Sequence, residues 1–411
     1  MERKWWTLIL ISTATFMLLL DITVVNVALP DIQRELGASL SSLQWVVDAY
    51  ALTLAAFLLT AGSLGDRLGR RRVFALGFVI FTGASFLCGI AGDPTLLNLA
   101  RGLQGVGGAG MFATSLALIG QEFHGKDRAT AFGVWGATVG GAVAIGPLVG
   151  GVITEHLGWE WIFFVNIPIG LAAIALTERK IVNVAAEDAE PVDLPGLLTF
   201  SLALFLLIFG LIRGNPEGWG SPLILACLGG AVALLLAFVA IERRSAYPML
   251  DLHLFRNPAF NGVSAVAFGL SAGMFAMFLY LTIYMQGVLD FSPLEAGLRF
   301  LPLTVLSFIA SPIAGSLSHR IPIRILLGVG LTLVGVGLLL MHGVSPDSEW
   351  TTLLAGFLVA GVGIGVTNPG IGQAAIAVVP VEKSGMGSGI NTTFRQVGIA
   401  TGVAALGAIF Q

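Results

Sequence analysis

The most constraining feature of this sequence is its repetition of apolar stretches long enough to cross a lipid bilayer. A helix needs about 20 apolar residues to span the hydrocarbon core, and the chain contains thirteen such stretches. Short polar segments separate most of them, so the spans are expected to pack side by side in a compact bundle. The predicted spans cover residues 5–28, 43–64, 72–92, 95–120, 130–154, 160–177, 195–213, 221–241, 259–286, 296–317, 323–341, 351–378 and 387–410.

The composition agrees with a membrane protein built from helices. Of the 411 residues, 56% are hydrophobic and 11% are charged, and the mean hydropathy is +0.90, whereas a soluble domain has roughly 25% charged residues. Only helices or closed barrels satisfy all backbone groups in lipid, and these stretches are too long and too continuous for barrel strands. We therefore predict an all-α membrane protein. The first stretch lacks a small-residue cleavage site and contains Asp21 and Asn26, so it is interpreted as the first span rather than as a removable signal peptide.

The basic residues are distributed unevenly between the two sides of the membrane that these spans define. With the N-terminus in the cytoplasm, sixteen of the 21 Lys and Arg residues lie on the inward side and three on the outward side. The remaining two, Arg101 and Arg395, lie inside spans. Cytoplasmic loops carry such a basic excess, so the pattern predicts a cytoplasmic N-terminus.

Two long polar segments, both predicted to be cytoplasmic, divide the chain. Residues 178–196 and 242–258 bracket the seventh and eighth spans. The predicted parts are therefore an N-terminal six-helix bundle over residues 1–178, an inserted helix pair with its linkers over 179–258, and a C-terminal bundle over 259–411. The last bundle has five spans, so a further helix is expected after Gln411.

An internal repeat supports this division. The sequence "GSLGDRLGRR" (62–71) recurs as "GSLSHRIPIR" (315–324), and a fainter match relates residues 96–107 to 352–363 at nearly the same offset. Related halves of this kind enclose a central site in many transporters.

The first copy of this repeat combines glycines and charges at the inward end of the second span. Glycines permit close backbone approach and a tight turn, and the charged side chains can contact neighbouring helix ends. A simple cytoplasmic anchor would explain the arginines but not an acid and three glycines among them. The segment resembles the loop signature of the major facilitator superfamily, where it acts as a cytoplasmic latch between outward-open and inward-open states. The implied latch residues are Gly62, Gly65, Asp66, Arg67, Gly69, Arg70 and Arg71.

Further segments extend this resemblance over nearly the whole chain. "LLNLARGLQGVGGAG" (96–110) resembles the helix 4 motif of the superfamily, and "GPLVGG" (146–151) resembles its antiporter-associated helix 5 motif. "LDITVVNVALPDI" (20–32) and "NTTFRQVG" (391–398) are similar to stretches of its fourteen-helix drug:proton antiporters. The resemblance implies the major facilitator fold, with two pseudo-repeat six-helix bundles and two inserted helices. The sequence departs from the pattern at Ala142, where the helix 5 motif usually begins with glycine, and in the absence of a fourteenth span.

The helix 5 motif also has a purely physical interpretation. Its glycines would let another helix pack closely, and Pro147 lacks a backbone donor and favours a bend. Close packing and bending together would seal the bundle on one side. Ordinary small-residue packing explains each position equally well. The residues concerned are Gly141, Gly146, Pro147, Gly150 and Gly151.

Asp21 and Arg101 are charges placed within apolar spans, where an unpaired charge costs about 2.5–3.5 kcal/mol. Asp21 lies nine residues before Pro30, and Arg101 lies seven residues after Pro94. At about 1.5 Å per residue their depths differ by about 3 Å, so the two side chains could meet. One interpretation is a permanent ion pair that fixes two helices. The other is a proton site at which Arg101 and bound substrate compete for the Asp21 carboxylate.

Aromatic, methionine and polar residues within the spans are candidates for a substrate cavity. Such a mixture suits promiscuous binding through adaptable packing and cation–π contacts. For each residue, packing against lipid or another helix is the alternative. The candidates are Asn26, Tyr50, Met111, Phe112, Trp135, Phe275, Phe278, Tyr280, Asn391 and Arg395.

Together these features predict a proton-coupled antiporter that exports small amphipathic or cationic drugs across the bacterial cytoplasmic membrane. We expect it to function as a monomer in the bilayer, with a drug-like small molecule as its partner and no nucleic acid. No phosphate-binding loop or metal-ligand spacing is present, so protons serve as the coupling ion and no cofactor or metal is expected. A narrow exporter of a metabolite or self-made antibiotic is the alternative within transport. A non-transporting receptor or enzyme is disfavoured by the repeated halves and by the lack of a catalytic constellation.

Overall fold

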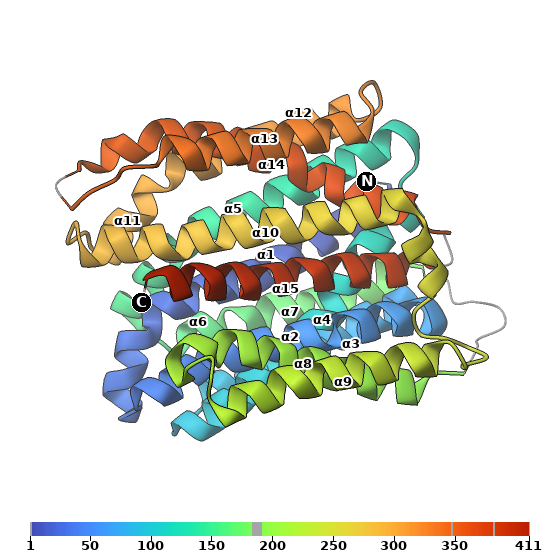
Figure 1. Ribbon diagram of the computed structural model, residues 1–411, viewed down its shortest axis with the longest axis horizontal. Helices are drawn as coiled ribbons and strands as arrows, with labels where there is room; N and C mark the ends of the chain where they lie inside the picture. Colours follow the sequence, from blue (N-terminus) through green and yellow to red (C-terminus); the bar gives the residue numbers. More distant parts are fainter. Residues whose placement is uncertain (1, 183–190, 347, 381–382, 411) are drawn as a thin grey trace.

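The chain forms a bundle of helices that run along its long axis (Figure 1). The computed structural model describes residues 2–182, 191–346, 348–380 and 383–410. Two short 3-10 helices, η1 (Leu252–Arg256) and η2 (Trp350–Leu353), accompany the α-helices. The α-helices are α1 (Arg3–Leu36), α2 (Leu40–Leu68), α3 (Arg70–Gly89), α4 (Pro94–Glu122), α5 (Gly125–Leu157), α6 (Trp161–Phe164), α7 (Asn166–Lys180), α8 (Leu194–Glu217), α9 (Pro222–Glu242), α10 (Pro258–Gly287), α11 (Pro293–Arg299), α12 (Leu301–Leu317), α13 (Ile323–Leu340), α14 (Leu354–Ala377) and α15 (Ser384–Phe410).

Two of the predicted spans are divided into consecutive helices. The span at 160–177 forms α6 and α7, and the span at 296–317 forms α11 and α12. Pro168 and Pro302 lie at the starts of the second helices, and neither residue can donate a backbone hydrogen bond to the preceding turn. The span at 351–378 forms the short η2 and then α14, and the other predicted spans each correspond to one long helix. Within the described ranges, ten helical segments are long and apolar enough to cross a membrane, when α6 with α7 and η2 with α14 are each counted as one continuous segment. Helix α12 is a shorter apolar helix of 17 residues.

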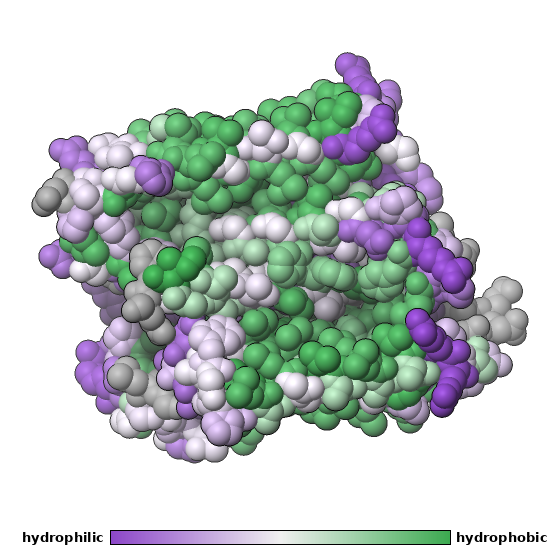
Figure 2. Space-filling view, in the orientation of Figure 1, coloured by the Kyte–Doolittle hydropathy of each residue, from purple (hydrophilic) through white to green (hydrophobic). Residues whose placement is uncertain are grey.

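The surface has the pattern expected of a protein surrounded by lipid. On the face shown in Figure 2, hydrophobic residues form a broad central band and hydrophilic residues gather at the two ends of the bundle. Large apolar side chains such as Leu99, Leu236 and Leu339 are more than two-thirds exposed, at 69%, 67% and 74%. An apolar surface of this extent marks contact with another apolar phase, so the chain is a multi-pass membrane protein.

The helices form two packed groups with a pair beside them. In the N half (α1–α7), α1 packs against α5, and α4 packs between α2 and α3. In the C half (α10–α15), α10 packs against α15, and α14 packs against α12 and α13. Helices α8 and α9 pair with each other, and α8 contacts α2 and α15. The halves meet where α2 runs along α15 and α5 runs along α12.

The internal repeat forms the same feature in both halves. Its copies are the turns from α2 to α3 and from α12 to α13. Gly62, in the first copy, packs against Gly385 of α15 in the other half, and Gly315, in the second, packs against Gly133 of α5. Both crossings lie at the end of the bundle that holds the N-terminus (Figure 1). We call this end the basic end, because the loops predicted on the side of the N-terminus carry most of the Lys and Arg residues. The repeated glycines therefore bring the two halves into close contact at this end.

Candidate functional site

Asp21 and Arg101 form an ion pair inside the N half. Asp21 Oδ2 accepts a hydrogen bond from Arg101 Nη1, and the two residues are 4% and 1% exposed. Helix α1 carries the acid and α4 carries the base. The two facing positions are thus in direct contact, as depth matching along the two helices predicts.

Gln104 and Ser85 extend this pair into a hydrogen-bonded cluster. Gln104 Nε2 donates to Asp21 Oδ1 at 2.9 Å and to Ser85 Oγ at 2.9 Å, while Gln104 Oε1 accepts from Arg101 Nη1 at 2.6 Å. Arg101 Nε donates to the Val46 carbonyl at 2.8 Å. Gln104 is not among the site residues predicted from the sequence, although its position three residues after Arg101 places both on one helix face.

Aromatic rings close the cluster from two sides. The Arg101 guanidinium carbon lies 4.5 Å from the centroid of the Tyr50 ring and 5.7 Å from that of Phe163. Both carboxylate oxygens of Asp21 already accept hydrogen bonds, and its side chain is 1% exposed. In this conformation the cluster is satisfied and sealed, so exchange of a proton would require the surrounding helices to move.

Two of the predicted latch residues hold the N-terminus of α15. Asp66 accepts hydrogen bonds from the backbone N–H groups of Gly385, at 2.9 Å, and Met386, at 2.7 Å. A carboxylate at this position is favoured by the free N–H groups and the dipole of the helix. Arg70 bonds Asp66 at 3.0 Å and Ser384 Oγ at 2.7 Å. These contacts join α2 and α3 of the N half to α15 of the C half.

The other latch arginines contact backbone carbonyls of the linkers around the inserted helix pair. Arg67 donates to the carbonyl of Pro191 in the first linker and to those of Tyr247 (3.0 Å) and Pro248 (3.1 Å) in the second. Arg71 forms a 3.3 Å ion pair with Glu178. The predicted latch therefore joins three parts of the chain.

The latch glycines serve two purposes: one adopts a backbone conformation that L side chains rarely adopt, and the others allow close packing. Gly69 has a φ of +98°, a backbone conformation that L side chains rarely adopt, and forms the turn between α2 and α3. A Cβ atom on Gly65 would lie 3.0 Å from a methyl group of Thr114 on α4. Together with the close approach of Gly62 to α15, these positions require glycine for space or for backbone conformation.

The helix 5 motif packs mostly within the N half. Gly146 lies against Thr23, and a Cβ atom on Gly150 would lie 3.2 Å from Val24 Cα, both on α1. Gly141 faces Phe308 of α12 at an ordinary contact distance of 3.6 Å, and Gly151 has open space around it. Helix α5 is continuous through position 147, and the side chain of Pro147 lies outside the described residues.

The closest approach of α5 to the C half involves earlier glycines. A Cβ atom on Gly133 would lie 2.9 Å from Pro312 Cα, and one on Gly136 would lie 3.0 Å from Pro369 Cγ. Tight packing between the halves therefore occurs nearer the basic end of α5 than the motif at 146–151.

Several predicted cavity residues meet where the halves join. Trp135 of α5 is 1% exposed, its Nε1 donates to Thr15 Oγ1 at 3.1 Å, and its ring centroid lies 6.3 Å from that of Phe112. The guanidinium carbon of Arg395, from α15, lies 5.9 Å from the Trp135 ring. Arg395 Nη2 donates to Asn368 Oδ1 of α14 at 2.7 Å. Asn368 is a further polar residue of this region that the sequence analysis missed, because it lies in a glycine-rich span with no charged neighbour.

Other predicted cavity residues lie elsewhere. Tyr50 belongs to the Asp21 cluster, because its ring covers Arg101. Met111 is fully buried against Gly77 of α3, so it packs inside the N half. Asn26 is exposed on α1. In this conformation Tyr50 and Met111 pack within the N half, and their place in a substrate cavity stays a prediction.

The C-half candidates divide in the same way. Phe278 lines a small cavity at the junction of the halves and packs on Phe300 with ring centroids 5.0 Å apart. Phe275 is half-buried beside the C-half core. Tyr280 donates to the Val403 carbonyl of α15 at 2.9 Å, which ties α10 to α15. Asn391 is 2% exposed and lies one helical turn before Arg395.

The comparisons with known proteins identify the family. The model of the Major Facilitator Superfamily matches residues 11–403. The chain belongs to the major facilitator superfamily. A solved structure of the human organic anion transporter MFSD10 (TETRAN) has the same fold as this superfamily member, with a TM-score of 0.70, 15% sequence identity and coverage of 99% of this chain and 94% of that chain.

Curated bacterial relatives are similar over almost all of this superfamily member. The multidrug resistance protein Stp of Mycobacterium tuberculosis is 37% identical over 98% of this chain and 75% of its own length. The puromycin resistance protein pur8 of Streptomyces alboniger is 39% identical over 99% and 82%, respectively. A riboflavin transporter, RibZ, of Clostridioides difficile is 32% identical over 100% and 89%. The chain is therefore a membrane transporter and not an enzyme, as the sequence predicts.

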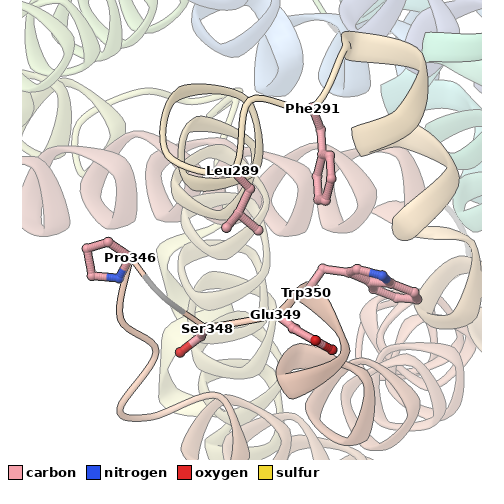
Figure 3. Close-up of a pocket in the computed structure, with 6 residues that line it drawn as sticks. All are labelled: Leu289, Phe291, Pro346, Ser348, Glu349 and Trp350. Carbon is pink, nitrogen blue, oxygen red and sulfur yellow. The ribbon is translucent and has the colours of Figure 1, made fainter.

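Two pockets between residues that the structure describes differ in size and position. The cavity beside Phe278 and Asn368 has a volume of about 20 Å³, which is room for about one water molecule. A wider pocket of about 440 Å³ opens at the end opposite the basic end, between the segment after α10 and the segment before η2. Figure 3 shows Phe291 and Trp350 on its two walls. Since the cavity beside Phe278 and Asn368 is too small for a drug-sized molecule, binding at these residues requires the halves of this superfamily member to separate.

Proposed function

We propose that this transporter exports drug-like compounds across the bacterial cytoplasmic membrane in exchange for protons, with its N-terminus in the cytoplasm. The observation that carries the proposal is the buried Asp21–Arg101 pair, because an acid inside the membrane commonly serves as a proton relay. Relatives named for multidrug resistance and puromycin resistance support drug-like substrates. Membership of the fourteen-helix subfamily and function as a monomer remain predictions.

Helix α1 provides a physical route for coupling. It carries Asp21 and, six residues earlier, Thr15, which accepts the hydrogen bond from Trp135 at the junction of the halves. Six residues span about 9 Å of helix. Protonation of Asp21 would remove its charge attraction to Arg101 and loosen α1 from α4. A shift of α1 would then move Trp135 and alter the surface offered to substrate.

The energy of one proton suffices for useful export. One proton crossing a potential of about 100 mV supplies roughly 2.3 kcal/mol, which corresponds to about a 50-fold concentration ratio of a neutral substrate. Exchange requires only that the proton-bound protein and the substrate-bound protein favour conformations that open to opposite sides of the membrane.

The proposal is tested by transport in proteoliposomes with an imposed pH gradient. The wild type should move a fluorescent drug in response to the gradient, and Asp21→Asn should bind the drug but lose this response. Asp31→Asn is the matched control, because this partly exposed acid lies on the same helix and its ion pair in the described structure is the local one with Arg34. Drug movement that ignores the gradient, or an Asp21→Asn protein that still follows it, would refute proton coupling.

A narrow substrate range is a second candidate within transport. Relatives named as a tetracenomycin C resistance and export protein and as a riboflavin transporter favour it. A panel of chemically unrelated compounds separates the two: a multidrug exporter moves several of them, whereas a narrow exporter moves one structural class.

A further inference from the structure

A buried polar cluster where the halves meet has donors that are not satisfied. It consists of Arg395 and Asn391 on α15, Asn368 on α14 and Ser307 on α12, which are 7%, 2%, 0% and 1% exposed. Among the residues that the structure describes, no hydrogen-bond partner is found for five buried polar atoms: Arg395 Nη1, Asn368 Nδ2, Ser307 Oγ and both amide atoms of Asn391. Buried polar groups are nearly always paired, so this concentration requires an explanation.

The orientation of the groups is determined by one hydrogen bond. Arg395 can only donate, so the atom of Asn368 that it contacts at 2.7 Å must be the carbonyl oxygen, Oδ1. The amide nitrogen of Asn368 is thereby left as a second free donor beside Arg395 Nη1. Asn391 lies four residues before Arg395 and shares its helix face. Arg395 and Asn368 thus present two free donors side by side, and Asn391 adds polar atoms one helical turn away.

The charge of the cluster is positive. Among the residues that the structure describes, Arg395 forms no ion pair, whereas Arg101 is paired with Asp21. The positive group is flanked by the Trp135 ring, 5.9 Å from the guanidinium carbon and contributed by the other half. An anionic oxygen would satisfy these donors with charge-assisted hydrogen bonds, and a cation would be repelled.

The cluster also lies where a substrate must pass. Asn368 and Ser307 line the 20 Å³ cavity together with Phe278 of α10 and Val139 of α5, so both halves contribute to its walls. When the halves separate, this layer becomes accessible from the opening side. Apolar and aromatic walls next to fixed donors are typical of a small-molecule site.

We propose that Arg395, with Asn368 and Asn391, is the anchoring site for an anionic oxygen, such as a carboxylate, on an aromatic substrate whose ring lies against Trp135. This inference rests on the proposed export of drug-like compounds but not on proton coupling. It assigns the substrate class as aromatic acids, in contrast to the cationic drugs that the sequence analysis included.

The test is equilibrium binding to the full chain in lipid nanodiscs at pH 7, without any gradient. The probes are three matched compounds: anthraquinone-2-carboxylate, its carboxamide, and an analogue with a trimethylammonium group. The wild type should bind the carboxylate about tenfold or more tightly than the carboxamide, and the ammonium analogue most weakly. Equal binding of carboxylate and carboxamide, or preference for the cation, overturns the proposal without any variant.

Variants then locate the preference. Arg395→Gln should abolish the carboxylate preference while the carboxamide still binds, and Arg395→Lys should retain much of it because the charge remains. Arg299→Gln is the control, since Arg299 stacks on Phe291 at the end of the C half that lies opposite the basic end. A folded Arg395→Gln protein that keeps the wild-type preference would contradict the assignment. The preference is a ratio of two affinities that depends on the charge of Arg395. A shift of Trp135 in Asp21→Asn should therefore change both affinities together and leave the ratio intact, so failure of proton coupling and failure of the anion site are separate results.

Discussion

Arg101 and Arg395, the two arginines buried in the middle of long helices, have opposite surroundings. Arg101 lies inside the N half, where Asp21, Gln104 and the Val46 carbonyl satisfy it. Arg395 lies where the halves meet and has one hydrogen-bond partner, Asn368, among the residues that the structure describes. A fully paired buried charge stabilises one arrangement of the helices, whereas removing one partner of such a pair is costly. The proton-coupled role proposed for the Asp21 site therefore requires its ion pair to break during transport. The ligand-binding role proposed for Arg395 requires no pair to break.

Truncating each arginine gives the largest expected difference between the two sites. Arg101→Met would leave the Asp21 carboxylate buried without its partner, which typically costs about 3–5 kcal/mol. Arg395→Met removes an unpaired buried charge, so stability should be unchanged or increased. The apparent unfolding temperature of the detergent-purified protein measures both effects.

A double variant isolates the pair itself. Asp21→Asn combined with Arg101→Met should recover much of the stability lost by Arg101→Met alone, because no uncompensated charge remains. If Arg395→Met destabilises as strongly as Arg101→Met, then Arg395 also serves a structural role and the comparison fails.

The sequence predicts the Asp21–Arg101 pair better than the surroundings of Arg395, for a physical reason. Helix rise is nearly constant, so the depths of Asp21 and Arg101 follow from counting residues along adjacent spans. The contact of Arg395 with Trp135 depends on how two halves pack, and no local pattern encodes that. The linker carbonyls bound by Arg67 are backbone groups, which carry no residue signature at all. Apolar length predicted the spans, but the breaks near Pro168 and Pro302 needed the structure to locate them.

Obstructing the contact between the halves should expose the surroundings of Arg395 but not those of Arg101. Gly62→Ala places a Cβ atom against the Gly385 carbonyl, and such overpacking typically costs about 1–3 kcal/mol. In a Cys227→Ser background, Asn391→Cys provides a thiol one turn from Arg395. We expect maleimide labelling at position 391 to increase about tenfold in Gly62→Ala.

The same protein contains its own reference thiol. Cys88 is fully buried in the Arg101 cluster, with Sγ 3.9 Å from Gln104 Oε1, and its labelling should not change. Gly151→Ala is the matched control, because open space surrounds Gly151. Equal increases at Cys88 and position 391 would mean that the whole bundle loosens, which would break the comparison.

Removing the latch charge should have a smaller effect in the same direction. Asp66→Asn keeps the size of the side chain but weakens its interaction with the N-terminus of α15, a charge–dipole contact worth about 0.3–1 kcal/mol. Labelling at position 391 should rise about threefold. Asp127→Asn is the control, since this acid also lies at the basic end but pairs with Lys4 of its own half at 2.8 Å. An Asp66→Asn protein with wild-type labelling would show that the glycine packing alone keeps α15 in place.

The smallest expected effect concerns the salt bridge that ties the second linker to the start of α15. Partial burial raises the pKa of the Asp251 carboxyl, but hydrogen bonds from Lys383 Nζ, at 2.7 Å, and from the His253 N–H lower it by more, so its pKa lies below the ordinary value. Because the folded pKa is the lower one, the contribution is complete above the ordinary value of about 3.9 and is lost as the pH falls through the folded pKa. The pair is partly exposed, with 24% and 43% of the two side chains accessible, so it contributes less than about 1 kcal/mol.

Between pH 6 and pH 3 the unfolding temperature of the wild type should therefore fall slightly more than that of Lys383→Gln, while Lys126→Gln should follow the wild type. Parallel curves for the wild type and Lys383→Gln would show that the Asp251–Lys383 salt bridge does not stabilise the position of α15, the helix that carries Arg395.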